Sequence, residues 1–410
     1  MNVLFVINSL DIGGAETFLM RLMGKLNSQN HSCFLYVLDP KKKNPSFEQA
    51  FFKETKATLI KDPEAHNPLL AFIFNKLNAV LQRFGYKDFY NNFLQKRKEK
   101  YFKRLLVKKY HIDLINSHLL SSDIFASTFF KPLLKIPHVI TMQGCYDSLI
   151  NIGGETMVAD AVSAIKNCNG MTYVADKNLS FLQQQNIHTP AIAKRIYNGI
   201  SSPDKSKFKH RSELGLRADD FIVGQVSRSI ESKGMEVAIK AVETLVEKRG
   251  MDKIKLILLG PENDYYARLK DKYAEKKYIL FPGETNNPVE WCGMFDIGIL
   301  PTWFASESCP SSIIEYLSCG RPVVSTTIGE IPGMIDAAGD KAGILVPYDK
   351  DNGKPSVEEI ADSIAAYYND KELYRRHSEL AKEAFTKFEI TKIEELYLEV
   401  YKQVLTKQTD

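Results

Sequence analysis

The sequence predicts an α/β protein with two doubly wound, Rossmann-like domains. Short runs of β-branched and apolar residues alternate with longer helical patterns along the chain, which is typical of parallel sheets covered by helices. The length of 410 residues exceeds what one hydrophobic core usually organises. Turn-forming residues gather at 198–204, where the apolar periodicity lapses, and they predict the boundary between the two domains.

Each half of the chain is expected to form its own parallel sheet. The expected strands of the first half are Val3–Asn8, Cys33–Leu38, Leu114–Ser117, His138–Met142, Gly170–Val174 and Ala191–Ile196. Those of the second half are Phe221–Val226, Lys255–Leu259, Tyr278–Phe281, Ile297–Leu300, Pro322–Thr326 and Gly343–Val346. Helices are expected after them at Val357–Tyr368, Lys371–Phe385 and Ile390–Leu405. The predicted domains are 1–200, 201–388 and a C-terminal helix, 389–410, whose apolar stripe suits a return to the first domain.

The composition is that of a globular protein. Hydrophobic residues make up 44% of the chain and charged residues 25%. A net charge of +4 is too weak in itself to indicate nucleic acid, so no nucleic-acid partner is predicted. The six cysteines are scattered without a C-x-x-C pair, which argues against a disulfide framework or a zinc site. Without a signal-peptide pattern or an apolar run of membrane-spanning length, we expect a cytoplasmic location and only peripheral contact with a membrane.

A glycine pair follows the first expected strand. Gly13 and Gly14 lie at a turn from strand to helix, where glycine lets the backbone approach a ligand and the N–H groups of the helix start favour an anion. The turn lacks the G-x-G-x-x-G spacing and the acidic residue of a nicotinamide cofactor site, which argues against a dehydrogenase. We predict a phosphate or sugar contact here; the alternative is that the glycines only permit the turn.

Two cations follow the first expected strand of the second half. Arg228 and Lys233 lie between a strand that ends at Val226 and a helix that starts near Val237. Parallel sheets bind ligands at this carboxyl edge, and the two charges suit a diphosphate. Arginine can bind two oxygens at once and lysine supplies a point charge. The alternative is a solvated loop whose charges are incidental.

Two glutamates flank the start of a short helix in the second half. Glu307 lies on the loop after the strand Ile297–Leu300, and Glu315 lies within a helix that Ser311 and Ser312 open. The first amides of this helix are expected to face a bound anion. One carboxylate can accept hydrogen bonds from a sugar and the other from a ribose. The alternative is a capping acid and an exposed helical glutamate.

The segment from Glu307 to Glu315 resembles the E-x7-E signature of the retaining family 4 glycosyltransferases, group 1 enzymes with the GT-B fold. Further motifs along nearly the whole chain follow the family's order. They are Gly13-Gly14-Ala15-Glu16, His118 after a strand, Tyr197-Asn198-Gly199-Ile200, Arg228 with Lys233-Gly234, Gly260 after the next strand, and Gly320-Arg321-Pro322 after the glutamates.

The resemblance implies two domains facing across a cleft, with the acceptor on the first and a UDP- or GDP-linked sugar donor on the second. It places Arg228 and Lys233 on the diphosphate, Glu315 on the ribose, and Glu307 and His118 near the transferred sugar. The further donor contacts that it implies are Gly13, Gly14, Asn198, Gly260, Ser311 and Ser312. The acceptor would be a glycan or a lipid-diphosphate-linked sugar in the assembly of a cell-surface polysaccharide or glycoconjugate.

The sequence departs from the family pattern at three places. Residues 307–310 read Glu-Ser-Cys-Pro instead of Glu-Gly-Phe-Gly, so the identity of the sugar is not carried over. Gln143 stands where many members have a histidine, which leaves His118 as the histidine candidate, with a purely structural role as its alternative. Residues 227–229 read Ser-Arg-Ser instead of Gly-Arg-Leu, which keeps the charge and changes the packing.

By resemblance, the sugar is transferred with retention of configuration: the acceptor hydroxyl attacks from the face that the nucleotide leaves, and a phosphate oxygen takes its proton. The protein then has to stabilise charge and place the reactants. Arg228 and Lys233 can offset the diphosphate charge, and no D-x-D motif stands at a strand end to hold a metal. We therefore expect activity without a metal or another cofactor.

Residues 86–110 are rich in lysine and arginine, with aromatic residues interleaved. A basic helix with an aromatic stripe suits an anionic membrane surface, where a lipid-linked acceptor would lie. The alternative is a helix whose apolar face enters the core.

Two other classes of protein fit parts of the pattern. One is another GT-B enzyme, such as a nucleotide-sugar epimerase or a phosphorylase, and the other is a non-catalytic nucleotide-sugar-binding or scaffold protein. The pairing of Arg228 and Lys233 with the two glutamates argues against the first class. Every expected site residue is present, so nothing indicates the second. The nucleotide, sugar, acceptor and oligomeric state stay open at this point.

Overall fold

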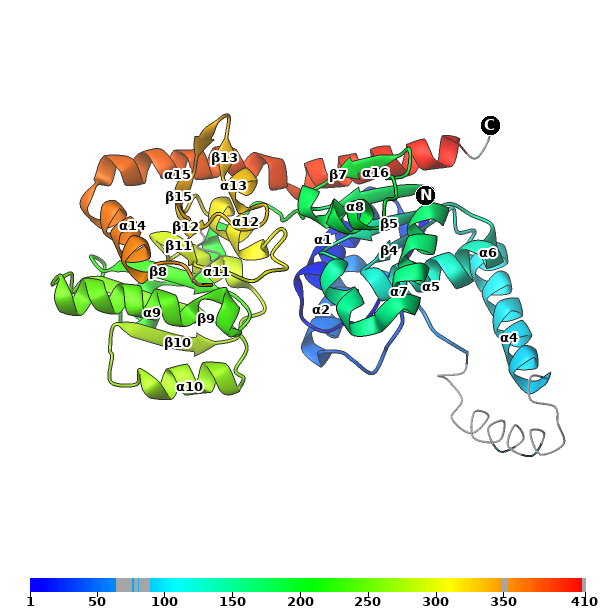
Figure 1. Cartoon of the computed structure of the whole chain (residues 1–410), viewed down its shortest axis with the longest axis horizontal. Helices are drawn as coiled ribbons and strands as arrows, with labels where there is room; N and C mark the ends of the chain where they lie inside the picture. The colour runs from blue at the N-terminus through cyan, green and yellow to red at the C-terminus, as the bar shows by residue number, and fades with distance from the viewer. Residues whose placement is uncertain (64–75, 77–79, 81–88, 348–352, 408–410) are drawn as a thin grey trace. The chain divides into compact units, whose positions relative to one another are not determined.

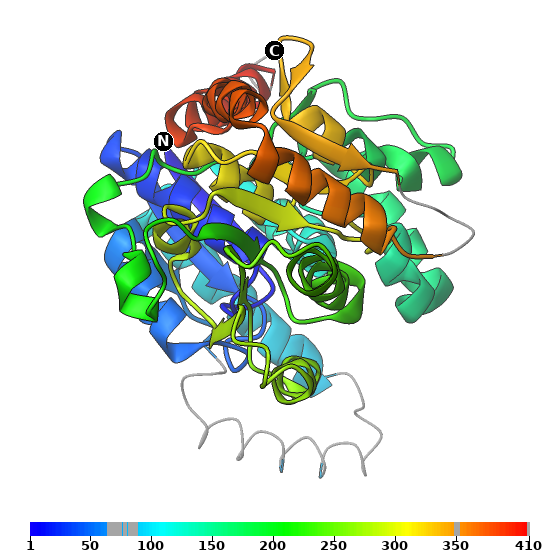
Figure 2. The same cartoon turned by 90° about the vertical axis from the view of Figure 1, so that its left-hand side faces the viewer.

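The computed structural model describes residues 1–63, 76, 80, 89–347 and 353–407, which divide into two units. Unit 1 comprises Met1–Tyr173, Leu179–Ile196 and Glu394–Asp410, and unit 2 comprises Val174–Asn178 and Tyr197–Ile393. Each unit is a parallel sheet covered by helices (Figure 1, Figure 2). The predicted α/β class with two doubly wound sheets is therefore confirmed, whereas the functional assignment of domains 1–200 and 201–388 stays a prediction.

Unit 1 has seven parallel strands in the order β3-β2-β1-β4-β5-β6-β7. They are β1 Asn2–Ile7, β2 Ser32–Val37, β3 Thr58–Ile60, β4 Leu114–His118, β5 His138–Met142, β6 Gly170–Tyr173 and β7 Ala193–Arg195. The edge strand β3 was not expected, because its three residues are too few to show a period-2 pattern. The main helices are α1 Gly14–Ser28, α2 Pro45–Thr55, α4 Phe89–Phe102, α5 Leu120–Phe125, α6 Lys131–Leu134, α7 Asp147–Asn167, α8 Ser180–Gln184 and α16 Ile390–Thr406. A π-helical segment, Lys103–Lys109, continues α4.

Unit 2 has six parallel strands in the order β10-β9-β8-β11-β12-β15. They are β8 Phe221–Val226, β9 Ile254–Leu259, β10 Ile279–Gly283, β11 Ile297–Leu300, β12 Val323–Thr326 and β15 Gly343–Val346, beside a small hairpin of β13 Asp336–Ala337 and β14 Asp340–Lys341. The helices are α9 Met235–Glu243, α10 Asp264–Lys272, α11 Pro288–Cys292, α12 Ser311–Ser318, α13 Ile331–Met334, α14 Val357–Asn369 and α15 Lys371–Phe385.

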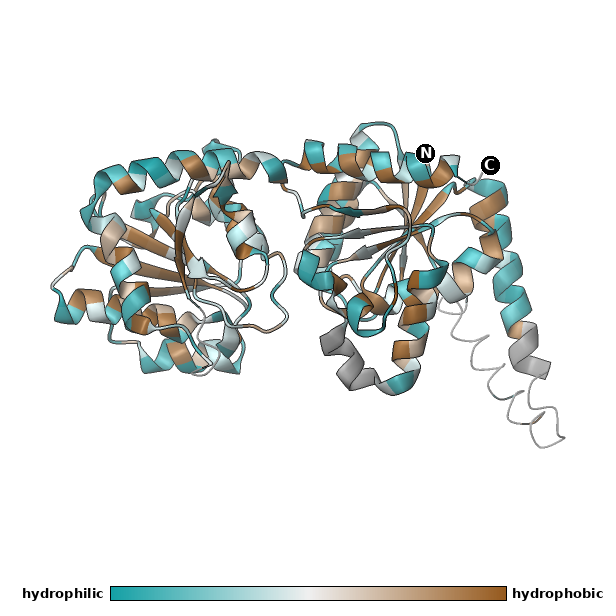
Figure 3. Ribbon diagram, turned by 45° about the horizontal axis from the view of Figure 1, so that its top comes forward, coloured by the Kyte–Doolittle hydropathy of each residue, from teal (hydrophilic) through white to brown (hydrophobic). Residues whose placement is uncertain are grey.

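The strands form the apolar centre of each unit. Figure 3 shows brown, hydrophobic strands most clearly in unit 2, with hydrophilic residues on the outer faces of the helices. In β1, Val3, Leu4, Phe5, Val6 and Ile7 are all fully buried. Parallel strands covered on both faces read as continuous apolar runs, which is why the strands could be located from the sequence.

The strand order reverses once in each sheet. The chain runs outward from β1 to β3 and then returns to place β4 on the other side of β1; in unit 2 it runs from β8 to β10 and returns to place β11 beside β8. At such a reversal the loops that follow the two central strands diverge and leave a crevice at the carboxyl ends of the strands. Each unit therefore offers one topologically favoured binding position.

The C-terminal helix α16 belongs to unit 1 from Glu394 onward, as the apolar stripe predicted. Its Tyr401 hydroxyl donates to Asn116 Oδ1 at 2.8 Å, and Thr172 donates to the Tyr397 hydroxyl at 3.3 Å. Gly170 allows the close approach of the helix, because a Cβ there would lie 2.7 Å from Val404 Cγ2.

The buried bond of Tyr401 makes the docking of α16 testable. We expect Tyr401→Phe to lower the free energy of unfolding by about 1–2 kcal/mol, because a buried acceptor loses a donor while the ring stays packed. The measurement is urea unfolding. Glu399→Gln on the same helix, which removes a half-exposed ion pair with Lys194, should change stability by less than about 0.5 kcal/mol. Equal effects of the two changes would contradict the docking role of Tyr401.

The start of α1 is covered by an acidic side chain from its own first turn. Gly13, the residue before the helix, has no side chain with which to cap it. A Cβ at Gly13 would lie 2.3 Å from Glu16 Oε2, so the Glu16 carboxyl folds back over this turn. Burial raises the pKa of Glu16 to about 7. Its own backbone N–H and Lys42 lower this pKa by smaller amounts, and Asp11 raises it slightly.

A raised pKa of Glu16 predicts a pH-dependent stability. Folding favours the protonated carboxyl, so this contribution is fully present below pH 4.5 and is lost as the pH rises toward 7. We expect the free energy of unfolding of Glu16→Gln, measured relative to that of the wild type, to be about 2–3 kcal/mol higher at pH 8 than at pH 4. Urea unfolding at both pH values measures it. The same change at exposed Glu54 serves as the control. A Glu16→Gln protein that is less stable than the wild type at pH 8 would show that the ionised carboxylate caps α1 better than a neutral amide does.

Candidate functional site

The loop after β8 brings Lys233 to the strand-order reversal of unit 2. A short 3-10 turn, Glu231–Lys233, follows β8, and Gly234 ends it with a φ of 80°. A Cβ at Gly234 would lie 2.2 Å from the carbonyl oxygen of Pro301, the first residue after β11. Glycine is required on both counts, and it lets the loops that follow β8 and β11 pack against each other.

Lys233 and Glu307 form a buried ion pair between these two loops. Lys233 Nζ lies 2.5 Å from Glu307 Oε2, and only 9% and 6% of the two side chains are exposed. The Thr302 hydroxyl donates to the same oxygen of Glu307 at 3.0 Å. Burial lowers the pKa of Lys233; Glu307 opposes this shift, and the neighbouring Arg228 adds to it. The structure thus joins two residues that lie 74 positions apart in the sequence.

Arg228 lies beside this pair, on an aromatic ring that the sequence analysis did not single out. Arg228 Cζ lies 5.0 Å and Lys233 Nζ 5.1 Å from the centroid of the Phe304 ring. Both distances are within the range of cation–π attraction. Arg228, Lys233 and Glu307 are therefore assembled around Phe304. An aromatic residue on the loop before Glu307 was the available signal, but nothing local in the sequence says which cations it meets.

Neighbouring segments hold the Glu307 loop on two sides. Asn178 Nδ2 donates to Ser308 Oγ at 3.0 Å, and Lys177 donates to the Ala305 carbonyl. The backbone N–H of Glu330 donates to the Ser308 carbonyl at 3.1 Å. Gly329, with a φ of 61°, lies so close that a Cβ would come within 2.4 Å of the Glu307 carbonyl oxygen. The loop is thus fixed by its surroundings.

Helix α12 places Glu315 as the sequence indicates. It spans Ser311–Ser318, and Pro310 before it makes no side-chain cap, so its first amides are not covered by a cap. Ser312 and Glu315 are buried, with 8% and 4% exposure. Tyr316 attaches the helix to both central strands, because its hydroxyl accepts from Val226 N at 2.7 Å and donates to the Ile299 carbonyl at 3.2 Å.

Asn198 and Gly260 are two further predicted donor contacts. The structure gives a packing reason for Gly260 but leaves a polar atom of Asn198 without a partner in the described chain. Asn198 is 5% exposed, and its Oδ1 is buried without a hydrogen-bond partner among the described residues. Gly260 has a structural reason, since a Cβ there would lie 2.5 Å from the Ser227 carbonyl oxygen. Asn198 therefore has an acceptor available for a ligand, whereas Gly260 supports the loop that carries Arg228.

In unit 1, the predicted residues lie at the other strand-order reversal. His118 ends β4 and Gly13 and Gly14 follow β1, the strand beside it. His118 is fully buried, its Nε2 lies 3.1 Å from Asn116 Oδ1, and its Nδ1 has no hydrogen-bond partner among the described residues. Burial lowers the pKa of His118 to about 3, so the ring is neutral, and the amide oxygen on Nε2 leaves Nδ1 as an acceptor. Gln143 at the end of β5 likewise has both amide atoms buried without a partner in the described chain.

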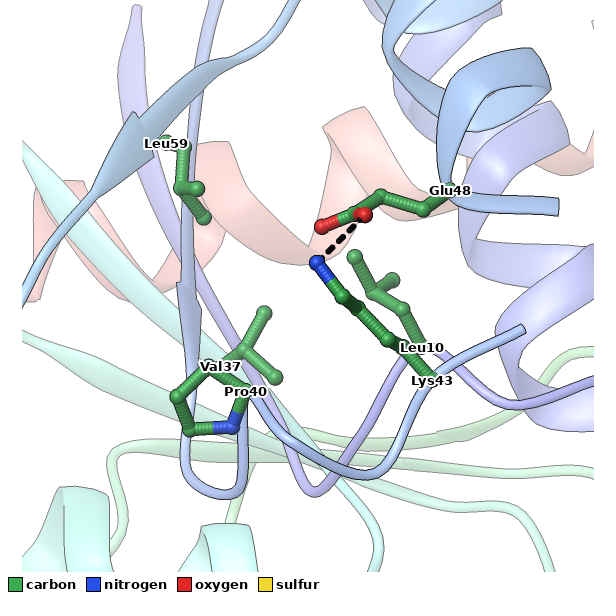
Figure 4. A pocket seen from close by; sticks show the side chains of 6 residues that line it. All are labelled: Leu10, Val37, Pro40, Lys43, Glu48 and Leu59. Carbon is green, nitrogen blue, oxygen red and sulfur yellow. Dashed lines mark hydrogen bonds and ion pairs between the residues drawn. The ribbon is translucent and has the colours of Figure 1, made fainter. Parts of the chain in front are cut away.

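A separate hollow in unit 1 is lined by none of the predicted residues. Figure 4 shows it between Leu10, Val37, Pro40, Lys43, Glu48 and Leu59, with Lys43 Nζ 2.7 Å from Glu48 Oε2. Backbone hydrogen bonds from Leu10 N to the Lys42 carbonyl and from Asn44 N to the Leu10 carbonyl tie the loop after β1 to the loop after β2. These bonds anchor the turn that contains Gly13 and Gly14.

The described residues offer neither a cluster of metal ligands nor a membrane-spanning helix. No group of three or more His, Cys, Asp or Glu side chains in them is placed to hold a metal ion. In the same part of the chain, no helix combines the length and apolarity that a bilayer span needs.

Comparison with known proteins relates the chain to glycosyltransferases. Residues 220–370 match the family model for group 1 glycosyl transferases. N-acetyl-alpha-D-glucosaminyl L-malate synthase of Bacillus anthracis is 27% identical over 216 residues, which are 51% of this chain and 53% of that protein. A putative colanic acid biosynthesis glycosyltransferase of Escherichia coli is 30% identical over 150 residues, 35% of this chain and 36% of the other. The chain thus spans about half or less of the length of these curated relatives.

Solved structures show the fold. Anabaena HepE in complex with UDP superposes with a TM-score of 0.72 at 17% identity, covering 98% of this chain and 100% of the other. WaaG, a glycosyltransferase of lipopolysaccharide biosynthesis, superposes with a TM-score of 0.64 at 15% identity, covering 97% and 99%. Residues 220–370 thus resemble group 1 glycosyl transferases, and the chain has the GT-B fold of two Rossmann-like domains that these solved glycosyltransferases share.

Proposed function

We propose that the protein is a retaining glycosyltransferase of family 4 that uses a nucleotide-diphosphate-sugar donor. The observation that carries this proposal is the assembly of Arg228, Lys233 and Glu307 at the strand-order reversal of unit 2. A diphosphate gains negative charge as the bond to the sugar breaks, and two fixed cations at that point stabilise the departing nucleotide.

Lys233 can serve Glu307 and a diphosphate at the same time. An ammonium group has three N–H donors, and the short contact with Glu307 uses one of them. The remaining donors suit phosphate oxygens, beside the two-oxygen grip of the Arg228 guanidinium. Lys233 and Thr302 both contact Oε2 of Glu307, so Oε1 can accept a hydroxyl of the transferred sugar. Glu315 would bind the ribose, with Asn198, Gly260, Ser311 and Ser312 as further donor contacts.

The proposed reaction needs no nucleophile from the protein. The acceptor hydroxyl attacks the sugar from the face that the nucleotide leaves, its proton passes to a phosphate oxygen, and the bond from the sugar to the diphosphate breaks. Neutral His118 would accept a hydrogen bond from the sugar at Nδ1 and would not act as an acid, given a pKa of about 3. Gly13 and Gly14 stay proposed phosphate contacts. Arg228 and Lys233 supply the positive charge, so we propose that no metal is required.

The relatives support a role in cell-surface glycan assembly. They include a putative colanic acid biosynthesis glycosyltransferase of Escherichia coli and a putative teichuronic acid biosynthesis glycosyltransferase of Bacillus subtilis, and HepE was solved with UDP and glucose. We propose a UDP- or GDP-linked donor and a glycan or lipid-linked acceptor for this chain. The alternative is a non-catalytic sugar-nucleotide-binding protein, and an activity assay distinguishes it from an enzyme.

Donor hydrolysis tests the cation site. Lys233→Met should lower the release of nucleotide from UDP- and GDP-sugars by about 100-fold or more, because the departing diphosphate loses a fixed positive charge. Glu307→Gln should also lower it, because the sugar loses an anionic acceptor. Each assay is run with and without EDTA, and equal rates are expected.

Controls keep this test interpretable. Removing one partner of a buried ion pair costs about 3–5 kcal/mol, so the double variant Lys233→Met/Glu307→Gln, which leaves no unpaired charge, is measured beside the single ones. Lys240→Met, on exposed α9 surface, should hydrolyse as the wild type does. Folded variants with full activity would overturn the roles assigned to Lys233 and Glu307. A wild type that binds the donor without turnover would favour a non-catalytic binding or scaffold protein. A rate that is lost in EDTA and restored by magnesium would refute metal independence.

The basic segment 86–110 is a proposed contact with anionic lipid. Residues 86–88 lie outside the described residues, and further along the segment Phe102 and Leu106 are buried in the core of unit 1. The opposite face leaves Tyr101 38% and Val107 43% exposed, beside exposed Lys103, Arg104 and Lys108. One face therefore packs on the core, and the other combines exposed cations with exposed apolar groups, which suits a membrane interface.

Liposome sedimentation tests this contact. We expect the protein to pellet with vesicles that contain phosphatidylglycerol but not with neutral phosphatidylcholine vesicles, and the triple variant Lys103→Gln/Arg104→Gln/Lys108→Gln to bind much less. A triple change at exposed Lys205, Lys207 and Lys270 of unit 2 removes the same charge elsewhere. Equal, negligible binding to both kinds of vesicle would remove the proposal.

A further inference from the structure

Phe304 is the only described residue for which the structure records two cations on one ring. Arg228 Cζ and Lys233 Nζ lie 5.0 and 5.1 Å from its centroid. Its backbone is held by the same network that holds Glu307, because Phe304 N donates to the Thr302 hydroxyl at 3.2 Å and Glu307 N donates to the Phe304 carbonyl at 2.9 Å. The backbone that carries this ring is thus held by hydrogen bonds, and the ring lies beside both charges.

Two like charges at one ring repel each other before any ligand arrives. Arg228 indeed adds to the lowering of the pKa of Lys233, so each cation disfavours the other. Glu307 offsets part of this repulsion through its bond to Lys233. The negative face of an aromatic ring attracts cations without adding a net charge, and it therefore offsets repulsion without competing for a phosphate as a second carboxylate would.

We propose that Phe304 is a positioning residue that holds the Arg228 guanidinium and the Lys233 ammonium in the arrangement that a diphosphate binds. This inference rests on the proposed function and names a residue beyond it. A site whose cations are already placed loses less conformational freedom when the ligand arrives, and this raises affinity. Phe304 touches neither phosphate nor sugar in this role, so its effect should appear in binding of the diphosphate part alone.

The neighbouring Trp303 offers a matched control. Trp303 also carries a cation, because Lys354 Nζ lies 5.3 Å from its ring, but Lys354 is not one of the proposed diphosphate ligands. Trp303 packs against the core of unit 2. Loss of either aromatic ring removes apolar contacts from the same loop, whereas only Phe304 supports Arg228 and Lys233.

Calorimetric titration with inorganic pyrophosphate, UDP and GDP tests the proposal on the full chain. We expect Phe304→Leu to weaken pyrophosphate binding, and binding of whichever nucleotide the wild type takes, by about ten-fold, which corresponds to 1.4 kcal/mol. Phe304→Tyr keeps the ring face and should stay within about two-fold of the wild type. Trp303→Leu should bind as the wild type does, and thermal unfolding checks that every variant is folded.

The outcomes separate this inference from the function on which it rests. A folded Phe304→Leu protein that binds pyrophosphate as tightly as the wild type overturns the role of Phe304 and leaves the proposed function intact. A Phe304→Tyr protein as weak as Phe304→Leu also overturns it, because the ring face would then not be what matters. A wild type that binds neither pyrophosphate nor UDP nor GDP overturns the proposed function itself.

Discussion

The ion pair between Lys233 and Glu307 is the contact on which the candidate site depends. It joins the loop after β8 to the loop after β11, and both side chains are almost completely withdrawn from water. Taking two charges out of water costs several kcal/mol for each ion, and their attraction repays this only with good geometry and further hydrogen bonds. Thr302 supplies such a bond to Glu307. Replacing a buried ion pair by apolar residues of similar volume is often neutral or stabilising in other proteins, so stability alone does not explain these two buried charges.

The topology of the sheets explains why these loops meet. In each unit the chain reverses its direction across the sheet between the two central strands, β1 and β4 in unit 1 and β8 and β11 in unit 2. The candidate residues Gly13, His118, Arg228 and Glu307 all lie at or just after the carboxyl end of one of these four strands. Two residues far apart in sequence thus become neighbours because the strands before them are paired.

Local sequence determines much of this arrangement and long-range packing determines the rest. Strands such as β1 could be located because burial on both faces leaves a continuous apolar run, and α12 could be bounded because Pro310 precedes it and Gly320, with a φ of 66°, follows it. The strand β3 and the role of Phe304 could not be predicted. A three-residue strand is defined by its pairing with β2, and the cations on the Phe304 ring come from a loop about 70 residues earlier in the chain.

The family motifs contain two kinds of residue, and the structure separates them. Gly234 and Gly260 are required by close backbone approaches, so a protein that had lost its chemistry but kept its fold would keep them as well. His118 Nδ1, Asn198 Oδ1 and the Gln143 amide are different, because they are buried without a hydrogen-bond partner in the described chain. Each such atom costs about 1–3 kcal/mol unless a ligand or water satisfies it. Water or a polar ligand that donates or accepts a hydrogen bond at such an atom removes this cost. Close backbone approaches thus explain the glycines, whereas the proposed contacts of His118 and Asn198 use atoms that folding leaves without a partner in the described chain.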